Sequence, residues 1–152
     1  MMSPLVAFAG PVWRLVPEAQ AETPAAPARA PEGRFHHSGQ IAAYASLSAE
    51  GTIVAIQRYL GDGVRRVLVP MWLQAERVAD ERGNPAASIV WQDMPGRGAR
   101  APTWDVSDAA RAQGGQAMLY TSRSRPDLAH VVVFDPSCLS LVGPITAWSP
   151  DA

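Results

Sequence analysis

Two segments of the chain carry residue types that bind and transform charged ligands. The first runs from Arg34, in a loop with a glycine at each end, through Tyr44 and Ser46 to Glu50. The second reaches Ser122 after an apolar run and continues into two arginines. Arginine pairs with phosphate through two donors, an aromatic face stacks on a flat ring, and an anion stabilises a developing cation. Each segment also has a purely structural interpretation, as a turn before an amphipathic helix or as a polar surface loop.

The elements that must position these residues are short. Apolar alternation and apolar runs predict strands over residues 12–16, 41–46, 64–73, 88–92, 117–120, 130–135 and 139–145. Pro70 predicts an edge position or a bulge. A first helix is expected over residues 52–60 with Ser48 as its N-cap, and a second helix from Asp105 or Ser107 to Gln113. Residues 75–83 are expected to form a turn or a short helix.

This set of elements predicts an α+β fold. About six strands with two or three helices in mixed order favour a mixed, mainly antiparallel sheet over a doubly wound one. A chain of 152 residues suits one domain, so residues 1–152 are expected to fold as a single unit. Residues 18–32 are rich in alanine and proline and lack an apolar period, which predicts an irregular loop. That loop is either a lid over a pocket or unordered chain.

Composition excludes several classes of protein. Thirteen basic residues against 14 acidic ones give a net charge of −1, which argues against a nucleic-acid-binding protein. All the basic residues are arginine, so only the position of an arginine can argue for a functional role. No apolar run is long enough for a spanning helix, and the first ten residues lack the basic start of a signal peptide. We therefore expect a cytoplasmic protein that does not contact membranes.

Three further signals favour structural roles. Adjacent side chains such as His36 and His37 rarely bind one ion, so no metal site is expected. Cys138 has no local base motif and is expected to pack in the core or at a strand end. Packing in the core is also the expected role of the five tryptophans, Trp13, Trp72, Trp91, Trp104 and Trp148.

The ordered set of motifs resembles the RES domain family over nearly the whole chain. The resemblance rests on WRLV at 13–16, GRF at 33–35 with Gly39 and Tyr44, GQAMLYTS at 115–122 before Pro126, and HVVVF at 130–134. RES proteins are the toxins of bacterial toxin–antitoxin pairs, resemble ADP-ribosyltransferases in fold and consume NAD. The resemblance therefore implies that the chain binds NAD and breaks the bond between nicotinamide and ribose.

The same resemblance assigns residues to this chemistry. The family's two arginines fall on Arg14 and Arg34, its tyrosine on Tyr44 and its serine on Ser122. Together with Ser46, on the strand of Tyr44, these are the expected NAD-binding residues. The family's glutamate falls on Ala55, and Gln57 lies just after it. The nearest preceding acid, Glu50, therefore joins Arg34, Tyr44 and Ser122 as a catalytic candidate.

The chemistry explains why these groups are needed. Nicotinamide leaves NAD with the bonding electrons, so the ribose becomes a cation that an anion stabilises. The resemblance implies transfer of ADP-ribose to a protein, or to water or phosphate, and an Xre-like helix-turn-helix antitoxin that blocks the active site. Two alternatives stay open: a catalytically inactive NAD-binding or antitoxin-binding module, favoured by Ala55, and a plain structural domain.

Overall fold

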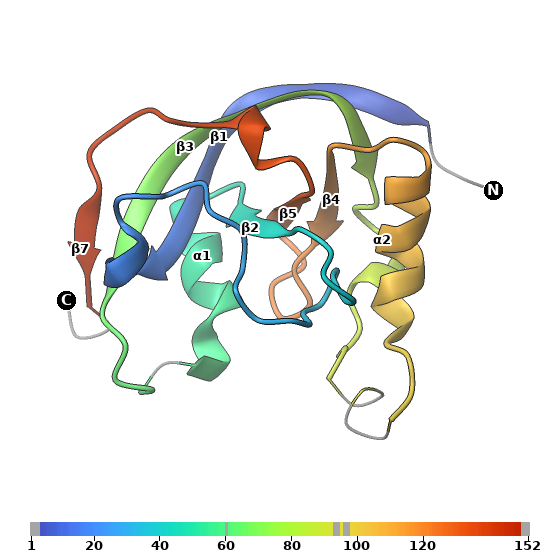
Figure 1. Cartoon of the computed structure of the whole chain (residues 1–152), viewed down its shortest axis with the longest axis horizontal. Coiled ribbons are helices and arrows are strands. Elements are labelled where there is room, and N and C mark those ends of the chain that lie inside the picture. The colour runs from blue at the N-terminus through green and yellow to red at the C-terminus, as the bar shows by residue number, and fades with distance from the viewer. Residues whose placement is uncertain (1–3, 60, 93–94, 96–97, 150–152) are drawn as a thin grey trace.

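The computed structural model describes residues 4–59, 61–92, 95 and 98–149. This part of the chain contains seven strands and two α-helices (Figure 1). The strands are β1 (Leu5–Pro17), β2 (Ala43–Ser46), β3 (Arg66–Asp80), β4 (Ala117–Thr121), β5 (Ala129–Val133), β6 (Leu139–Leu141) and β7 (Thr146–Trp148). The helices are α1 (Ala49–Ala55) and α2 (Pro102–Ala112).

The sheet closes into a ring of five strands. The long strands β1 and β3 pair antiparallel over almost their whole length, and β1 also meets β2 at Trp13 and Ser46. From β2 the ring continues antiparallel through β5 to β4, which pairs with β3 in the parallel direction. The short strands β6 and β7 pair with the same edge of β3 as β4, opposite the edge that pairs with β1. The predicted α+β class with a mainly antiparallel sheet is confirmed.

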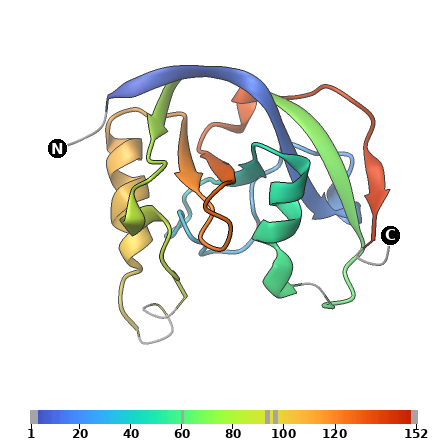
Figure 2. The same cartoon turned by 180° about the vertical axis from the view of Figure 1, so that it is seen from behind.

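Two apolar layers hold the ring together. On one face, alternate residues of β1, β3 and β5 are fully buried, among them Val12, Val69 and Val131. On the other face, Met118 and Val132 pack with Phe35 and with Ala110 of α2. Strands buried on both faces explain the continuous apolar run of β5. Figures 1 and 2 show α1 and α2 on opposite sides of the short strands β2, β5 and β4.

Several boundaries differ from those predicted. The turn or short helix predicted over residues 75–83 is wrong for residues 75–80. These residues continue β3, with Ala75, Val78 and Ala79 buried. Residues 88–92 do not form a strand. The second helix begins at Pro102, since proline has a preset φ and needs no donor at the first helical position. Asp105 lies in its first turn, so neither Asp105 nor Ser107 is the cap.

Other local predictions are confirmed or refined. The Oγ of Ser48 accepts a hydrogen bond from Gly51 N at 3.0 Å and caps α1, which is followed by a 3₁₀ turn at Gln57–Tyr59. Pro70 lies in the gap between the stretches of β3 that pair with β6 and β7, and its carbonyl accepts from Val142 N. The N–H that proline lacks would face this gap, so no hydrogen bond between paired strands is lost. Of the predicted strand over residues 139–145, only 139–141 form a strand, β6, and β7 begins just after the predicted range.

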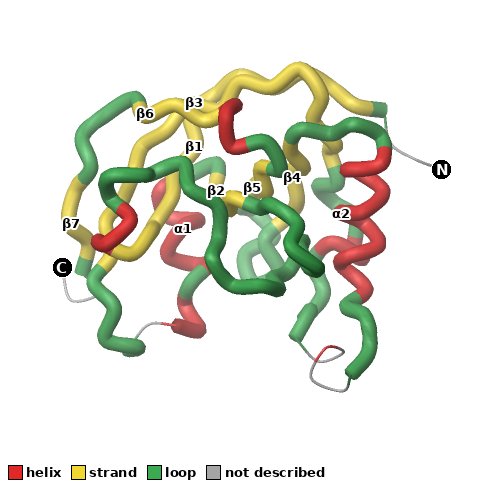
Figure 3. Tube along the Cα trace, viewed as in Figure 1, coloured by secondary structure: helices red, strands yellow, loops and turns green. Residues whose placement is uncertain are grey.

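The alanine- and proline-rich segment is packed against the sheet. After a 3₁₀ turn at Glu18–Gln20 it runs irregularly across the front of the molecule in Figure 3. Two of its alanines, Ala21 and Ala25, contact the buried core. Its far end, at residues 28–32, reaches the candidate site described below. No helix in the described part of the chain is long and apolar enough to cross a membrane.

Candidate active site

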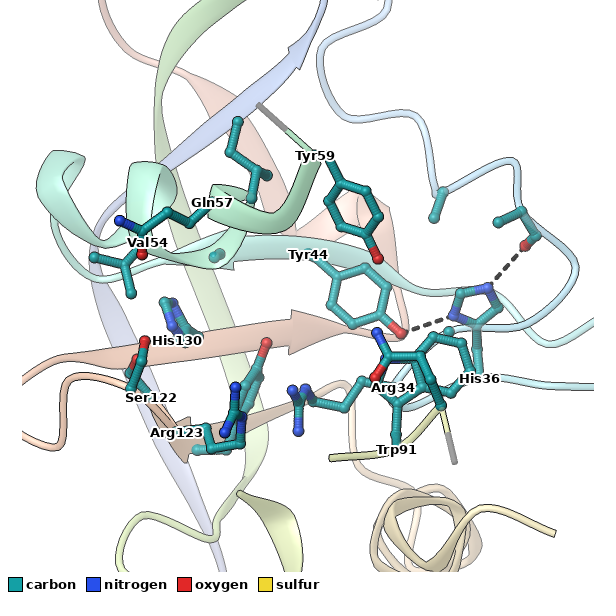
Figure 4. Close-up of a pocket in the computed structure, with 18 of the residues that line it drawn as sticks. Arg34, His36, Tyr44, Val54, Gln57, Tyr59, Trp91, Ser122, Arg123 and His130 are labelled. Carbon is teal, nitrogen blue, oxygen red and sulfur yellow. Dashed lines mark hydrogen bonds between the residues drawn. The ribbon is translucent and has the colours of Figure 1, made fainter. Parts of the chain in front are cut away.

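A pocket of about 460 Å³ opens between α1, the 30–36 turn, residues 91–92 and the loop from β4 to β5 (Figure 4). This volume lies within the usual range for small-molecule sites. Residues from all these elements line it, among them Arg34, His36, Tyr44, Val54, Ala55, Gln57, Tyr59, Trp91, Ser122, Arg123 and His130. Three residues predicted from the sequence, Arg34, Tyr44 and Ser122, therefore meet in one pocket.

Helix α2 fixes the turn that carries Arg34. Three consecutive carbonyl groups of the turn accept hydrogen bonds from side chains of α2: Gly33 from Trp104 Nε1, Arg34 from Thr103 Oγ1, and Phe35 from an Arg111 guanidinium nitrogen. The Phe35 ring is fully buried and meets Tyr120 edge to face at 4.6 Å. Because its backbone is held at three points, the turn presents the Arg34 side chain from a rigid base.

A short relay of hydrogen bonds fixes Tyr44. The Nε2 of His36 lies 2.8 Å from the carbonyl of Ala30, which only accepts, so Nε2 donates and Nδ1 accepts from the Tyr44 hydroxyl at 2.7 Å. The same hydroxyl accepts from Phe35 N at 3.0 Å. A Cβ at Gly33 would lie 2.3 Å from the His36 ring, so only glycine fits there. Burial raises the pKa of Tyr44 well above its ordinary value.

Within the described lining of the pocket, positive charges outnumber negative ones. Arg34 donates to the carbonyl of Ile89, and its side chain extends toward Arg123 across the pocket in Figure 4. Among the lining residues that the structure describes, Glu32 is the one carboxylate, and it is exposed. Two guanidinium groups against one carboxylate favour an anionic ligand, and a guanidinium binds phosphate oxygens through paired donors.

Ser122 is held at the end of β4 with its hydroxyl available to the pocket. The side chain is 3% exposed, and its backbone N–H donates to the carbonyl of Leu128 at 3.0 Å. The Oγ accepts from Arg125 N at 3.3 Å. Since that bond uses only a lone pair, the O–H can still donate to a ligand.

Comparison with known proteins agrees with this geometry. A family model described as the RES domain matches residues 11–151. The chain belongs to the RES domain family. Among solved structures, a chain of the M. tuberculosis MbcT–MbcA toxin–antitoxin complex matches with a TM-score of 0.62 and 14% identity, covering 96% of this chain and 85% of that chain. That similarity shows a shared fold. No curated protein matches the chain.

Arg14, which the resemblance assigns to the family's first arginine, lies outside the pocket lining. Arg14 is 5% exposed, and burial lowers its pKa to about 10. One of its terminal nitrogens donates to the carbonyls of Pro24 and Ala26 at 2.6 and 2.9 Å, and its Nε donates to that of Tyr44 at 2.9 Å. In this arrangement Arg14 ties the 18–32 segment to β2 from behind the pocket.

Glu50 also lies outside the lining, whereas Ala55 belongs to it. Glu50 is exposed and accepts a hydrogen bond from a terminal nitrogen of Arg125 at 2.8 Å, and Arg125 also pairs with Asp127. This exposed pair links α1 to the loop after β4 and contributes little stability. The position to which the resemblance assigns the family's glutamate therefore faces the pocket but holds a methyl group in this chain.

Sequence reasoning missed residues that face the pocket. His130 lines it, while Ser46, predicted to bind the ligand, lies behind His130 and bonds to it at 2.7 Å. The histidine begins an apolar strand, so its pattern predicts only burial.

The prediction that all tryptophans fill the core is wrong. Trp104 is buried, but Trp91 lines the pocket and Trp72 is 38% exposed. Cys138 packs against the core as predicted.

Proposed function

We propose that this RES domain is the toxin of a toxin–antitoxin pair, that it binds NAD and that it cleaves the bond between nicotinamide and ribose. The observation that supports this function best is the convergence of Arg34, Tyr44 and Ser122 on one positively charged pocket. The similar fold in a toxin–antitoxin complex supports the toxin role. A cytoplasmic location belongs to the same proposal.

Each of the three residues has a role in binding. The Arg34 guanidinium pairs with the diphosphate, which carries the negative charge of the cofactor. The Tyr44 hydroxyl is tied to His36 and Phe35, so its ring is fixed as a surface on which nicotinamide stacks. The Ser122 O–H donates to the carboxamide or to a ribose hydroxyl. Tyr59 and Trp91 add aromatic surface to the lining.

Cleavage is favoured because the nicotinamide ring is cationic in bound NAD and becomes neutral when it leaves. The C–N bond breaks and both electrons leave with nicotinamide, which departs neutral, so the ribose becomes a cation. An acceptor oxygen then bonds to that carbon and loses its proton. The acceptor is a protein side chain, or water or phosphate. Fixed dipoles in a site that excludes water stabilise such a cation more than bulk water does.

Regulation by an antitoxin completes this proposal. A toxic enzyme needs a partner that blocks it, and we propose a helix-turn-helix, Xre-like protein that inserts a segment into the pocket. The charge of Arg34 and Arg123 favours an insert that carries carboxylates. Binding of nucleic acid or membrane by this chain itself is not part of the proposal.

A second candidate function follows from Ala55. Because this lining residue carries no carboxylate, the ribose cation lacks the nearby anion that the RES resemblance implies. Removing one charged transition-state contact typically costs about 3–4 kcal/mol, or roughly 10²–10³ in rate. A catalytically inactive module that binds NAD or the antitoxin is therefore the alternative.

Release of nicotinamide separates the two functions. The purified chain is incubated with NAD, and nicotinamide is quantified by chromatography. Arg34→Ala is measured beside the matched surface variant Arg82→Ala, whose arginine pairs with Asp80 outside the pocket lining. The toxin proposal expects release by the parent and by Arg82→Ala, with at least about a tenfold loss in Arg34→Ala. Binding of NAD with no nicotinamide above the protein-free blank supports the inactive module instead.

A further inference from the structure

A buried pair of side chains, His130 and Ser46, lies at the wall of the pocket. The two residues are directly opposite each other in the register of β2 and β5. His130 is 5% exposed and Ser46 is 2% exposed, and Nδ1 of the ring lies 2.7 Å from Oγ. His130 lines the pocket whereas Ser46 does not. The serine therefore acts on the pocket only through the histidine.

The count of protons fixes the tautomer of His130. Within the described part of the chain, His130 Nδ1 is the one hydrogen-bond partner of the Ser46 hydroxyl. A buried O–H that finds no acceptor is costly, so Ser46 donates and Nδ1 accepts. In a neutral imidazole the proton then resides on Nε2. His130 therefore presents an N–H at its far end.

That N–H faces the pocket. Across the described residues, every buried side-chain nitrogen or oxygen has a hydrogen-bond partner, and Nε2 of His130 bonds to none of these residues. Nε2 is consequently in contact with solvent, and the pocket is the solvent space that His130 lines. In Figure 4 the ring lies beside Ser122, on the far side of the pocket from His36.

The surroundings keep the ring neutral. Burial, followed by the positive charge of Arg34, lowers the pKa of His130 to about 4. The Tyr120 ring packs against it with centroids 5.4 Å apart, and burial raises the pKa of that phenol to about 12. Arg34, Tyr120, Ser46 and Ser122 are polar groups near the ring, and none of them changes charge near neutral pH. One donor is present at every pH from about 5 upward.

We propose that His130 is a ligand-binding residue whose Nε2–H donates to an acceptor oxygen of the bound dinucleotide, and that Ser46 is the positioning residue that holds this tautomer. The inference rests on the proposed function, because the dinucleotide is the ligand. A phosphate or ribose oxygen is the chemical partner, since both accept hydrogen bonds and both suit a pocket that contains Arg34. The bond adds a neutral, directional contact to the charge of that arginine.

The tautomer is tested first, in the ligand-free chain. Two-bond ¹H–¹⁵N spectra of ¹⁵N-histidine-labelled protein distinguish Nε2–H from Nδ1–H, with His130→Gln used to assign the signal. The expected result is Nε2–H with no titration between pH 8 and pH 5, and a mixture of tautomers in Ser46→Ala. An Nδ1–H or charged ring at pH 7 would overturn the proposal.

The ligand contact is tested by NAD titration of two variants. His130→Gln keeps an N–H near the position of Nε2, whereas His130→Leu keeps apolar volume without a donor. Calorimetry should show about a tenfold loss of affinity in His130→Leu and a loss of less than about threefold in His130→Gln. Circular dichroism melts test whether each variant is folded. If a His130 variant is unfolded, Ser46→Ala is titrated in its place, and its affinity for NAD should be about threefold lower than that of the parent.

The outcomes separate the two proposals. If the parent binds NAD and His130→Leu binds it equally well, the role of His130 is rejected and the proposed function stands. If the parent binds no NAD in the titration, the proposed function and the ligand contact are both rejected.

Discussion

Acid should destabilise this protein through His130, and substitution by glutamine should remove that sensitivity. The ring is buried, 5% exposed, and its pKa is lowered from 6.5 to about 4, first by burial and then by Arg34. Between these two pH values the unfolded chain binds a proton that the folded chain excludes. Stability is therefore fully present above pH 6.5 and is lost as the pH falls toward 4.

The size of the effect follows from that pKa difference. Each unit corresponds to about 1.4 kcal/mol, so the His130 contribution lost is about 1.4 kcal/mol at pH 5.5 and about 3 kcal/mol at pH 4. The buried position of the ring means that solvent screens this effect little. Asp108, whose pKa is lowered to about 2, titrates below this window.

Urea unfolding of the parent and His130→Gln at pH 7, 5.5 and 4 measures the effect. Other groups titrate in both proteins, so they cancel in the difference between the two free energies of unfolding. The free energy of unfolding of His130→Gln minus that of the parent should rise by about 3 kcal/mol from pH 7 to pH 4. A difference that stays constant across the series would show that the ring is not buried as a neutral group, and would refute the reasoning.

Three further substitutions test other parts of the structure. Arg14→Ala removes the donor that holds three part-buried carbonyls, so trypsin should cut after the exposed Arg29 several-fold faster. Unchanged cleavage would contradict the tether. Tyr44→Phe leaves the N–H of Phe35 unpaired and should lower the free energy of unfolding by about 1–3 kcal/mol in urea melts, whereas an equal midpoint would exclude the relay. Ala55→Glu places a carboxylate in the pocket and should speed nicotinamide release about a hundredfold. An unchanged rate with NAD affinity retained would show that position 55 does not act on the ribose.

The elements of the fold could largely be predicted from the sequence because alternation and capping are local. Ser48 caps α1 as predicted, and Arg14 lies on the same strand face as Val12 and Val16. The extension of β3 beyond position 73 could not be predicted, since it depends on pairing with β1 residues far away in the chain. Pairing of distant strands sets such boundaries more than local pattern does.

The site was predictable only in part, for the same reason. Arg34, Tyr44 and Ser122 meet as the RES resemblance implies. Arg14 does not join them, because the 18–32 segment covers the face of the strand that carries it. His130 was missed because its hydrogen-bond partner, Ser46, lies 84 positions earlier and is brought opposite by strand pairing. Neighbours of this kind leave no trace in a local pattern.

Calorimetric titration of NAD into the parent chain and into Arg34→Ala tests the central claim most directly. The claim is that one pocket, with Arg34 at its centre, holds this cofactor. The account predicts saturable binding at one site per chain, weakened at least about tenfold in the variant. Absence of binding by the folded parent, or equal affinity in the two proteins, would contradict it.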